Sequence, residues 1–445
     1  MVKRIKRSKL NNQNSSHKSN TSNKKKSKLS KFFSKLGPGF ITGASDDDPS
    51  GIATYSQTGA MFGYNQLWTA LFSFPFMTAI QEMCGRIGIV TGKGLAGVIK
   101  ENFSKKILYF CVSLLVIANI INIGADLGAM ASATKLIIDI DFGAALLIIT
   151  MLTVVLQVFV PYHWYAKILK YLTFSLLSYI VVAFIIHLNW SSILISTFIP
   201  HIILTKQYFI NIVAILGTTI SPYLFFWQAS EEVEEEVEKK EIRSMGAGIP
   251  KFTDQDLKDL KTDTVFGMFF SNLVMFFIII TVAGTVGVAG ISHIDTADQA
   301  ALALKPLAGD FAFLLFAIGI IGTGLLAIPI LAGSASYALS ETLGLREGLY
   351  LKFKRAHGFY GIIAISTILG LLINLISIPP FKMLYYAAII NGICAPPLLF
   401  IIMKISNNKK IMGEHSNTKW SNILGWTITA IMSIASVVLL VSLLY

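Results

Sequence analysis

Long apolar stretches recur along nearly the whole chain and are separated by short polar segments. A helix needs about 20 apolar residues to cross the hydrocarbon layer of a bilayer, so this pattern predicts an all-α integral membrane protein. We expect eleven transmembrane helices, near residues 38–62, 65–90, 107–135, 143–160, 168–188, 207–230, 264–290, 308–340, 358–378, 383–404 and 420–444. The composition agrees, because 54% of the residues are hydrophobic and only 14% are charged.

The positive charge of the chain is confined to its first segment. Residues 1–37 hold twelve Lys and Arg and no acid, which leaves 25 basic (37 minus 12) against 25 acidic residues in the rest. The segment is rich in Ser, Asn and Lys and lacks apolar periodicity, so we expect a disordered cytoplasmic tail. It is interpreted as a solvated orientation signal or a contact for anionic lipid headgroups, and no nucleic-acid partner is indicated.

Basic residues also set the expected orientation in the membrane. They gather in the loops that follow even-numbered spans, at residues 86–106, 167–170, 346–355 and 404–410. The positive-inside rule therefore places the N-terminus in the cytoplasm and the C-terminus outside a cell membrane. The three cysteines, Cys84, Cys111 and Cys394, lie far apart in apolar stretches, so neither a disulfide framework nor a zinc site is predicted.

Two of the predicted spans contain a proline and polar residues at their centre. The first reads Ser45-Asp46-Asp47-Asp48-Pro49, and the sixth reads Gly-Thr-Thr-Ile-Ser-Pro-Tyr at residues 217–223. Each proline removes a backbone donor and breaks the helix, and such backbone persists in a bilayer only where it faces a cavity or a ligand. Spans one and six are corresponding positions if spans one to five and six to ten are inverted repeats, and paired broken helices indicate a transporter binding site.

The acids of the first break favour a cation. A carboxylate at bilayer depth costs a few kcal/mol if it has no counter-charge, and we find no Lys or Arg in spans one or six to neutralise Asp46, Asp47 and Asp48. Asp48 also follows the C-terminal end of a half-helix, where free carbonyl groups add partial negative charge. The break therefore favours a metal ion over a substrate carboxylate.

Other polar residues are candidates for the ion path or for supporting contacts. Asp126, Asn122 and Asn391 are able to reach the ion or its water shell, or to form hydrogen bonds between helices. Glu82 either faces the cavity or pairs with Arg86 one turn on. The glutamates between Glu231 and Glu238 either draw or sense ions at the inner vestibule, or form a solvated helical extension.

Three motifs carry a family resemblance. They are Gly-Pro-Gly-Phe at 37–40 followed by Asp-Pro-Ser-Gly at 48–51, Gly-Ile-Val-Thr-Gly-Lys at 88–93, and Thr-Ile-Ser-Pro-Tyr at 219–223. Together they resemble the natural resistance-associated macrophage protein (NRAMP) transporters. The resemblance implies the leucine-transporter type of fold with five plus five inverted repeats over residues 38–188 and 207–404, an additional span over 420–444, and metal held between spans one and six.

The chain departs from the transition-metal NRAMP transporters at both breaks. Their first break reads Asp-Pro-Gly-Asn, whereas this chain keeps Asp48 and has Gly51 in place of Asn. Their sixth span binds through an alanine carbonyl and a methionine sulfur, where this chain has Thr218 and Ser221. Oxygen ligands suit hard ions and small residues leave room for bound water, so the chain is similar to the divergent NRAMP-related magnesium transporters.

The resemblance also bears on proton coupling. The family's sixth-span histidine aligns with Tyr223, and Ala129 stands where a family glutamate follows the acid matched by Asp126. We therefore expect a monomeric uniporter that carries Mg2+, with Mn2+ as a second substrate, by alternating access and without proton coupling or a cofactor. Asp48 and Asp47 would supply charge, Thr218 a carbonyl, and Ser221 and Gly51 space.

Alternative functions stay open. The first is a proton-coupled Mn2+ or Fe2+ transporter of the usual NRAMP type, and the second is an amino-acid transporter of the same fold, which three adjacent aspartates make costly. An intramembrane hydrolase using Asp48 and Asp126 would lack a recognisable nucleophile, so an enzyme is not predicted. A metal receptor would bind metal without transporting it.

Overall fold

The computed structural model describes residues 37–160, 173–376 and 378–444, and within them the regular structure is helical without a β-strand. The predicted all-α class is confirmed, and the predicted tail over 1–37 lies outside the described residues except for Gly37. The main helices are α2 (Pro38–Asp46), α3 (Pro49–Phe62), α4 (Trp68–Thr91), α6 (Lys105–Lys135), α7 (Phe142–Phe159), α9 (Leu177–Ile185), α11 (Lys206–Thr219), α12 (Pro222–Glu238), α13 (Asp254–Val282), α16 (Ala312–Leu343), α17 (His357–Ile373), α18 (Pro380–Ser406) and α20 (Lys419–Leu444).

Short helices connect the main ones. They are α5 (Leu95–Asn102), α10 (Trp190–Phe198), α14 (Ala297–Ala301), α15 (Lys305–Ala308) and α19 (Lys409–Met412). A π-helical turn over Ala283–Gly287 extends α13.

Seven segments of the described residues are long and apolar enough to cross a membrane: Lys105–Lys135, Phe142–Phe159, Lys206–Glu238, Asp254–Gly287, Ala297–Leu343, Pro380–Ser406 and Lys419–Ser442. The first predicted span is split between α2 and α3. The ninth corresponds to α17, a shorter apolar helix of 17 residues. The second is α4, which carries Glu82 and Arg86. The fifth falls partly on residues 161–172, outside the described residues, and continues as α9. The repeat boundaries stay a prediction.

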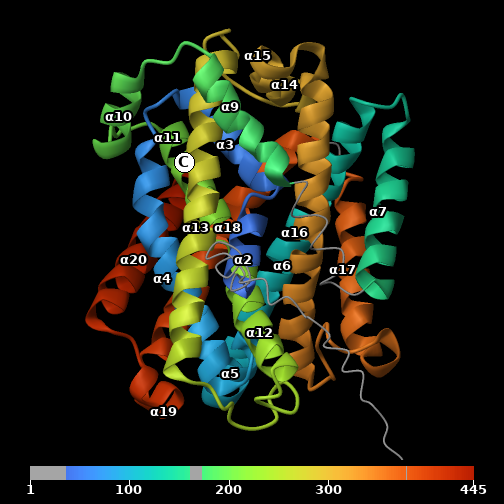
Figure 1. Ribbon diagram of the computed structural model, residues 1–445, viewed down its shortest axis with the longest axis vertical. Coiled ribbons are helices and arrows are strands. Elements are labelled where there is room, and N and C mark those ends of the chain that lie inside the picture. Colours follow the sequence, from blue (N-terminus) through green and yellow to red (C-terminus); the bar gives the residue numbers. More distant parts are fainter. Residues whose placement is uncertain (1–36, 161–172, 377, 445) are drawn as a thin grey trace, which may run out of the picture. The chain divides into compact units, whose positions relative to one another are not determined.

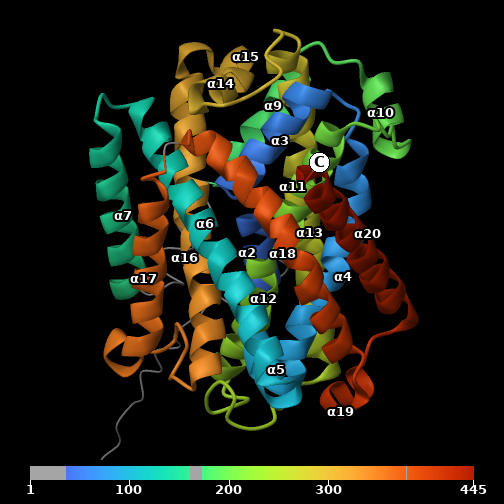
Figure 2. The same cartoon turned by 180° about the vertical axis from the view of Figure 1, so that it is seen from behind.

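The broken helices lie inside the bundle. Figure 1 shows α2 and α12 between α13 and α16, and Figure 2, the view from behind, shows α6 and α18 crossing on the side that faces the viewer. Helices α7 and α17 pack together at one edge, and α20 packs against α4 and α18 at the other. Both breaks are therefore enclosed by helices that continue past them.

Glycines bring α2 and α13 into backbone contact. A methyl group at Gly43 would overlap the carbonyl carbon and oxygen of Gly267, and one at Gly39 would lie 2.8 Å from the backbone nitrogen of Thr264. The N–H of Gly39 also donates to Asp263 Oδ2 at 2.7 Å, which ties the start of α2 to α13. This packing fixes the level of α13 beside the acids of the first break.

The acidic run after the second break is helical, because α12 continues to Glu238. The expectation of a solvated extension is wrong for Glu232, Glu234 and Glu236, which are buried where α12 packs against α4 and α16. Glu235 pairs with Lys239, with 2.8 Å between Oε1 and Nζ. The run is therefore part of the packed bundle.

Glu234 joins α12 to the loop after α16. Its carboxylate accepts hydrogen bonds from the Tyr337 hydroxyl and from the backbone N–H groups of Leu349 and Tyr350. Burial, together with the nearby charges of Glu341 and Glu234, raises the pKa of the Glu347 carboxyl to about 10. Glu347 is therefore protonated at neutral pH, so the ionised form of Glu234 meets less repulsion.

We predict that Gly43→Ala destabilises the protein by roughly 1–3 kcal/mol, because the methyl group would meet backbone rather than a flexible side chain. A thermal unfolding curve of the purified protein in detergent should show a lower apparent melting temperature. Gly361→Ala is the matched control, since a methyl group there has no neighbour within 4 Å. Equal melting temperatures for the two variants would contradict the contact.

Candidate metal site between the broken helices

The first break occupies two residues. Helix α2 ends at Asp46, Asp47 leaves helical geometry with φ −85° and ψ 47°, and Asp48 is extended at φ −67° and ψ 172°. Pro49 then begins α3, as expected for a residue whose fixed φ suits the first turn of a helix. The predicted break is confirmed, and it directs the three acids towards different neighbours.

Asp48 caps the second half-helix. Its Oδ1 accepts from the Ser50 hydroxyl and from the Gly51 N–H, each at 2.7 Å. Its Oδ2 lies 3.4 Å from the Tyr223 hydroxyl of α12, which also donates to the Ser45 carbonyl at 3.1 Å. The structure thus brings Tyr223 to Asp48 and connects the two breaks.

The second break lies between α11 and α12. Helix α11 ends at Thr219, and Pro222 begins α12 after the extended Ser221. The Ser221 hydroxyl turns back to the carbonyl oxygens of Gly217 and Thr218, at 2.7 and 2.8 Å. In this conformation the Ser221 hydroxyl is used as a hydrogen-bond donor at the end of α11. One lone pair of the Thr218 carbonyl oxygen accepts from it.

Gly51 lies beside both breaks. A methyl group at this position would be 3.1 Å from the Asp46 carbonyl oxygen, 3.3 Å from the ring of Tyr55 and 3.4 Å from the Thr218 hydroxyl. The missing side chain therefore lets the half-helices and Thr218 approach one another. The hydroxyls of Tyr55 and Thr218 are both buried here.

The acids are closed off from solvent and from positive charge. Asp46, Asp47 and Asp48 are at most 1% exposed. Within the described residues no Lys or Arg pairs with them, and Lys135 is exposed at the end of α6. No three His, Cys, Asp or Glu side chains of the described part form a metal-binding group. A bound ion would thus combine few carboxylates with hydroxyls, carbonyls and water.

Two predicted polar residues of α6 face the interior. Asn122 and Asp126 are fully buried one turn apart, and no nitrogen or oxygen of either side chain has a partner. Asp126 interacts electrostatically with Asp48. Asn391 of α18 is also buried without a partner, on the turn next to Gly392 that packs against Gly217 at the end of α11.

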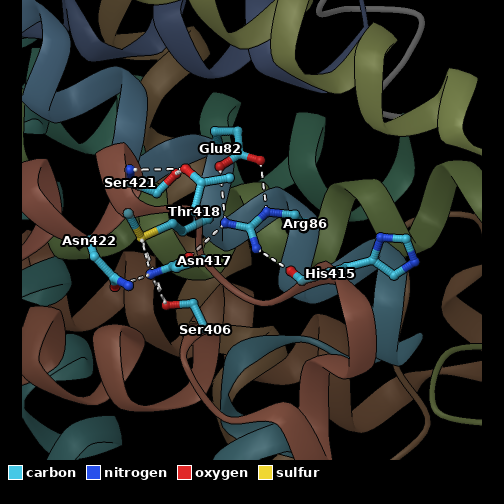
Figure 3. Close-up of polar contacts among 9 residues, drawn as sticks. Glu82, Arg86, Ser406, His415, Asn417, Thr418, Ser421 and Asn422 are labelled. Atoms are coloured by element: carbon cyan, nitrogen blue, oxygen red, sulfur yellow. Dashed lines mark hydrogen bonds and ion pairs between the residues drawn. The ribbon is translucent and has the colours of Figure 1, made fainter.

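Glu82 forms an ion pair within its own helix, α4. Figure 3 shows its carboxylate paired with Arg86, with 2.8 Å between Oε1 and Nε. Arg86 also donates to the His415 carbonyl and, at 2.8 Å, to Asn417 Oδ1, in the segment before α20. The i, i+4 pair is therefore confirmed, and Glu82 joins α4 to that segment.

Sequence reasoning missed two side chains at the first break. The Ser271 hydroxyl of α13 lies 2.5 Å from Asp46 Oδ2 and 3.3 Å from Asp47 Oδ1, and Tyr55 of α3 interacts electrostatically with the acids. Tyr55 follows Gly51 by one turn, so the helical period is a usable signal for it. Ser271 had no such signal, because its position depends on the contact between α2 and α13.

The arrangement defines a class of protein: an integral membrane protein with the leucine-transporter type of fold. A manganese transporter from Eremococcus coleocola superposes with a TM-score of 0.70 over 93% of this chain and 87% of that one, at 16% identity. Mhp1, a nucleobase-cation-symport-1 family transporter, gives 0.55 over 92% of this chain and 87% of its own, at 13% identity. The predicted fold class is confirmed.

The chain belongs to the natural resistance-associated macrophage protein-like family, whose model matches residues 39–442. A divalent metal cation transporter, MntH, from Klebsiella pneumoniae is 25% identical over 408 residues, covering 89% of this chain and 91% of the relative. MntH of Caldanaerobacter subterraneus is 24% identical over 421 residues, with 92% and 93% covered. The family resemblance expected from the motifs is confirmed.

We predict that Glu82→Gln lowers stability by roughly 1–3 kcal/mol, because Arg86 loses a charged hydrogen-bond partner, and leaves metal affinity unchanged. Unfolding curves and metal titrations of the same purified variant separate the two effects. Glu101→Gln is the control, because the Glu101 side chain is 56% exposed in its pair with Lys93. A clear loss of affinity in Glu82→Gln would return Glu82 to the ion path.

Proposed function

We propose that the protein is a secondary transporter of divalent cations, Mg2+ with Mn2+, that works by alternating access. The observation that carries the proposal is a set of buried carboxylates that lie beside two helix breaks and have no cationic partner among the residues the structure describes. Carboxylates in a low-dielectric interior need a compensating positive charge, and a transported cation supplies it. Both breaks end in residues with extended backbone, Asp48 and Ser221, each followed by the proline that begins the next half-helix.

The proposed ligands are oxygen atoms. Asp48, with Asp47 beside it, supplies negative charge, and Thr218 supplies a carbonyl or hydroxyl oxygen. Gly51 and Ser221 are small enough to leave coordination positions to water once the site opens. Mg2+ keeps several waters and is typically bound through one or two carboxylates, which suits this sparse set. The absence of sulfur among these residues disfavours softer metals.

The membrane potential is a sufficient driving force. At ~100 mV each elementary charge gains about 2.3 kcal/mol, so a divalent ion gains about 4.6 kcal/mol. This free energy supports an accumulation on the order of a thousandfold. We therefore propose uniport into the cytoplasm, with the N-terminus on that side of the cell membrane and one chain as the transporting unit.

The main alternative is a proton-coupled manganese transporter. The names of the relatives favour divalent metal transport over an amino-acid carrier or a hydrolase. Asp126 is a buried acid able to carry a proton, so this alternative differs from the proposal in the coupling and not in the site. Metal specificity and coupling are therefore the quantities to measure.

We predict that Asp48→Asn abolishes Mg2+ and Mn2+ uptake into proteoliposomes while the melting temperature changes little. The amide keeps the shape of the side chain and still accepts from Gly51, but it carries no charge. Glu101→Gln, the same chemical change at the surface, should transport like the parent. Full uptake by Asp48→Asn would place the central charge elsewhere.

We predict that Mn2+ influx into proteoliposomes follows the membrane potential and does not acidify the lumen. Tyr223 does not titrate near neutral pH in the way that histidine does, so the aligned position offers no proton carrier. Influx should be measured at a clamped potential with a pH dye inside, and reversing the potential should slow it. Acidification that grows with metal concentration would show that Asp126 or another carboxylate carries protons.

A further inference from the structure

Asn211 of α11 binds three other parts of the bundle through one amide group. Its Nδ2 donates to the Thr58 hydroxyl of α3 at 2.8 Å and to Gln66 Oε1 in the turn before α4. Its Oδ1 accepts from the Tyr385 hydroxyl of α18 at 2.9 Å. Asn211, Thr58 and Gln66 are fully buried. The amide therefore uses both of its hydrogens and its oxygen to hold α3, α11 and α18 together.

The hydrogens of the partner side chains are committed elsewhere. The Thr58 hydroxyl donates to the Thr54 carbonyl at 2.8 Å, so its oxygen is left to accept from Asn211. Gln66 Nε2 donates to the Tyr208 carbonyl at 3.0 Å, which leaves Gln66 Oε1 as the acceptor. Turning the amide over would set the Asn211 oxygen against the Gln66 oxygen. The network is therefore specific, and it is costly to break in a low-dielectric interior.

This network lies two helical turns from the candidate metal site, on the same helix faces. Thr58 follows Gly51 by seven residues on α3, and Asn211 precedes Thr218 by seven residues on α11. Seven residues make about two turns and span about 10 Å along a helix. A methyl group at Gly51 would lie 3.4 Å from the Thr218 hydroxyl, so α3 and α11 meet at both levels.

Helix α18 reaches the network from a contact beside the second break. A methyl group at Gly217 would overlap the Ala388 carbonyl oxygen and the Gly392 nitrogen, so the backbones of α11 and α18 touch there. Tyr385 precedes Gly392 by seven residues, which places its hydroxyl two turns further along α18. Figure 2 shows α3 and α11 towards the end of the bundle opposite α5 and α19. With the N-terminus in the cytoplasm, as proposed, this is the outer end.

We propose that Asn211, Thr58, Gln66 and Tyr385 form the outer gate of the ion path, with Asn211 as its positioning residue. In the described conformation these side chains hold α3, α11 and α18 together on the outer side of the metal site. Separating the helices breaks the hydrogen bonds of the amide, and water that enters with a hydrated cation replaces them. The inference rests on the proposed function, because it takes the transported divalent cation as the ion that passes.

The gate is tested by the accessibility of Thr54, which is fully buried on α3 between the two levels. Cells that express the full-length Thr54→Cys protein are treated with a membrane-impermeant thiol reagent, and the labelled fraction is read from the mass of the purified protein. Adding Asn211→Ala or Thr58→Val should raise the labelling rate about tenfold, as expected from the loss of one or two net hydrogen bonds. The protein without Thr54→Cys gives the background from its three buried cysteines.

Matched variants in the Thr54→Cys protein separate the gate from general packing. Thr58→Ser keeps the hydroxyl and should label like the parent, whereas Tyr385→Phe removes a hydroxyl and should label faster. Thr153→Val is the control for the loss of a buried threonine hydroxyl, because Thr153 donates to the Ile149 carbonyl of its own helix, α7. This control should label like the parent. If Asn211→Ala does not fold, Thr58→Val and Tyr385→Phe carry the test.

Transport gives a second measurement of the gate. A gate that closes poorly populates the outward-facing state, and the apparent affinity for a ligand rises with the fraction of the competent state. Thr58→Val should therefore lower both the KM for external Mn2+ and the maximal rate of uptake. A general loss of stability would lower the maximal rate without lowering KM.

The outcomes separate the gate from the proposed function. Unchanged labelling in both Asn211→Ala and Thr58→Val, or an equal increase in Thr153→Val, would overturn the gate. Labelling requires neither metal nor flux, so this result leaves Mn2+ uptake by the parent as separate support for the proposed function. Uptake retained by Asp48→Asn would contradict the proposed site, and the labelling rates would still decide the gate.

Discussion

The structure depends on the burial of three consecutive aspartates in an interior that cannot solvate their charges. Asp46, Asp47 and Asp48 are removed from water and have no cationic side chain paired with them in the described part of the chain. An unpaired charge in such surroundings is costly, so the surrounding helices supply hydroxyl and N–H donors instead. The remaining deficit of positive charge is what a cation would fill.

The backbone around the acids is shaped by the same requirement. Gly51 N–H and the Ser50 hydroxyl serve Asp48, and both are available only because Pro49 starts a new helix at that point. Gly43 and Gly267 then let α13 approach so closely that Ser271 reaches the other two acids. The small residues of these helices therefore have an electrostatic effect, although they carry no charge themselves.

The local features of the site could be predicted from the sequence, and those that depend on distant contacts could not. Pro49 and Pro222 mark both breaks correctly, because proline acts on its own helix. The pair of Glu82 with Arg86 followed from helical spacing. Ser271 beside Asp46, and the burial of Glu234, depend on how helices far apart in the chain meet, and an apolar helix that is hydrophobic on every side does not reveal its register.

The bond network of Glu234 has a mechanical consequence. Helix α12 has 17 residues and is unbroken from the second break to Glu238, so it is a rod about 25 Å long at 1.5 Å per residue. A tilt of about 10° at Ser221 would carry its far end through about 4 Å, which is more than a hydrogen bond tolerates. Glu234 lies near that far end and holds Leu349 and Tyr350. Any tilt of α12 about Ser221 would therefore have to break the hydrogen bonds by which Glu234 ties this helix to the loop after α16.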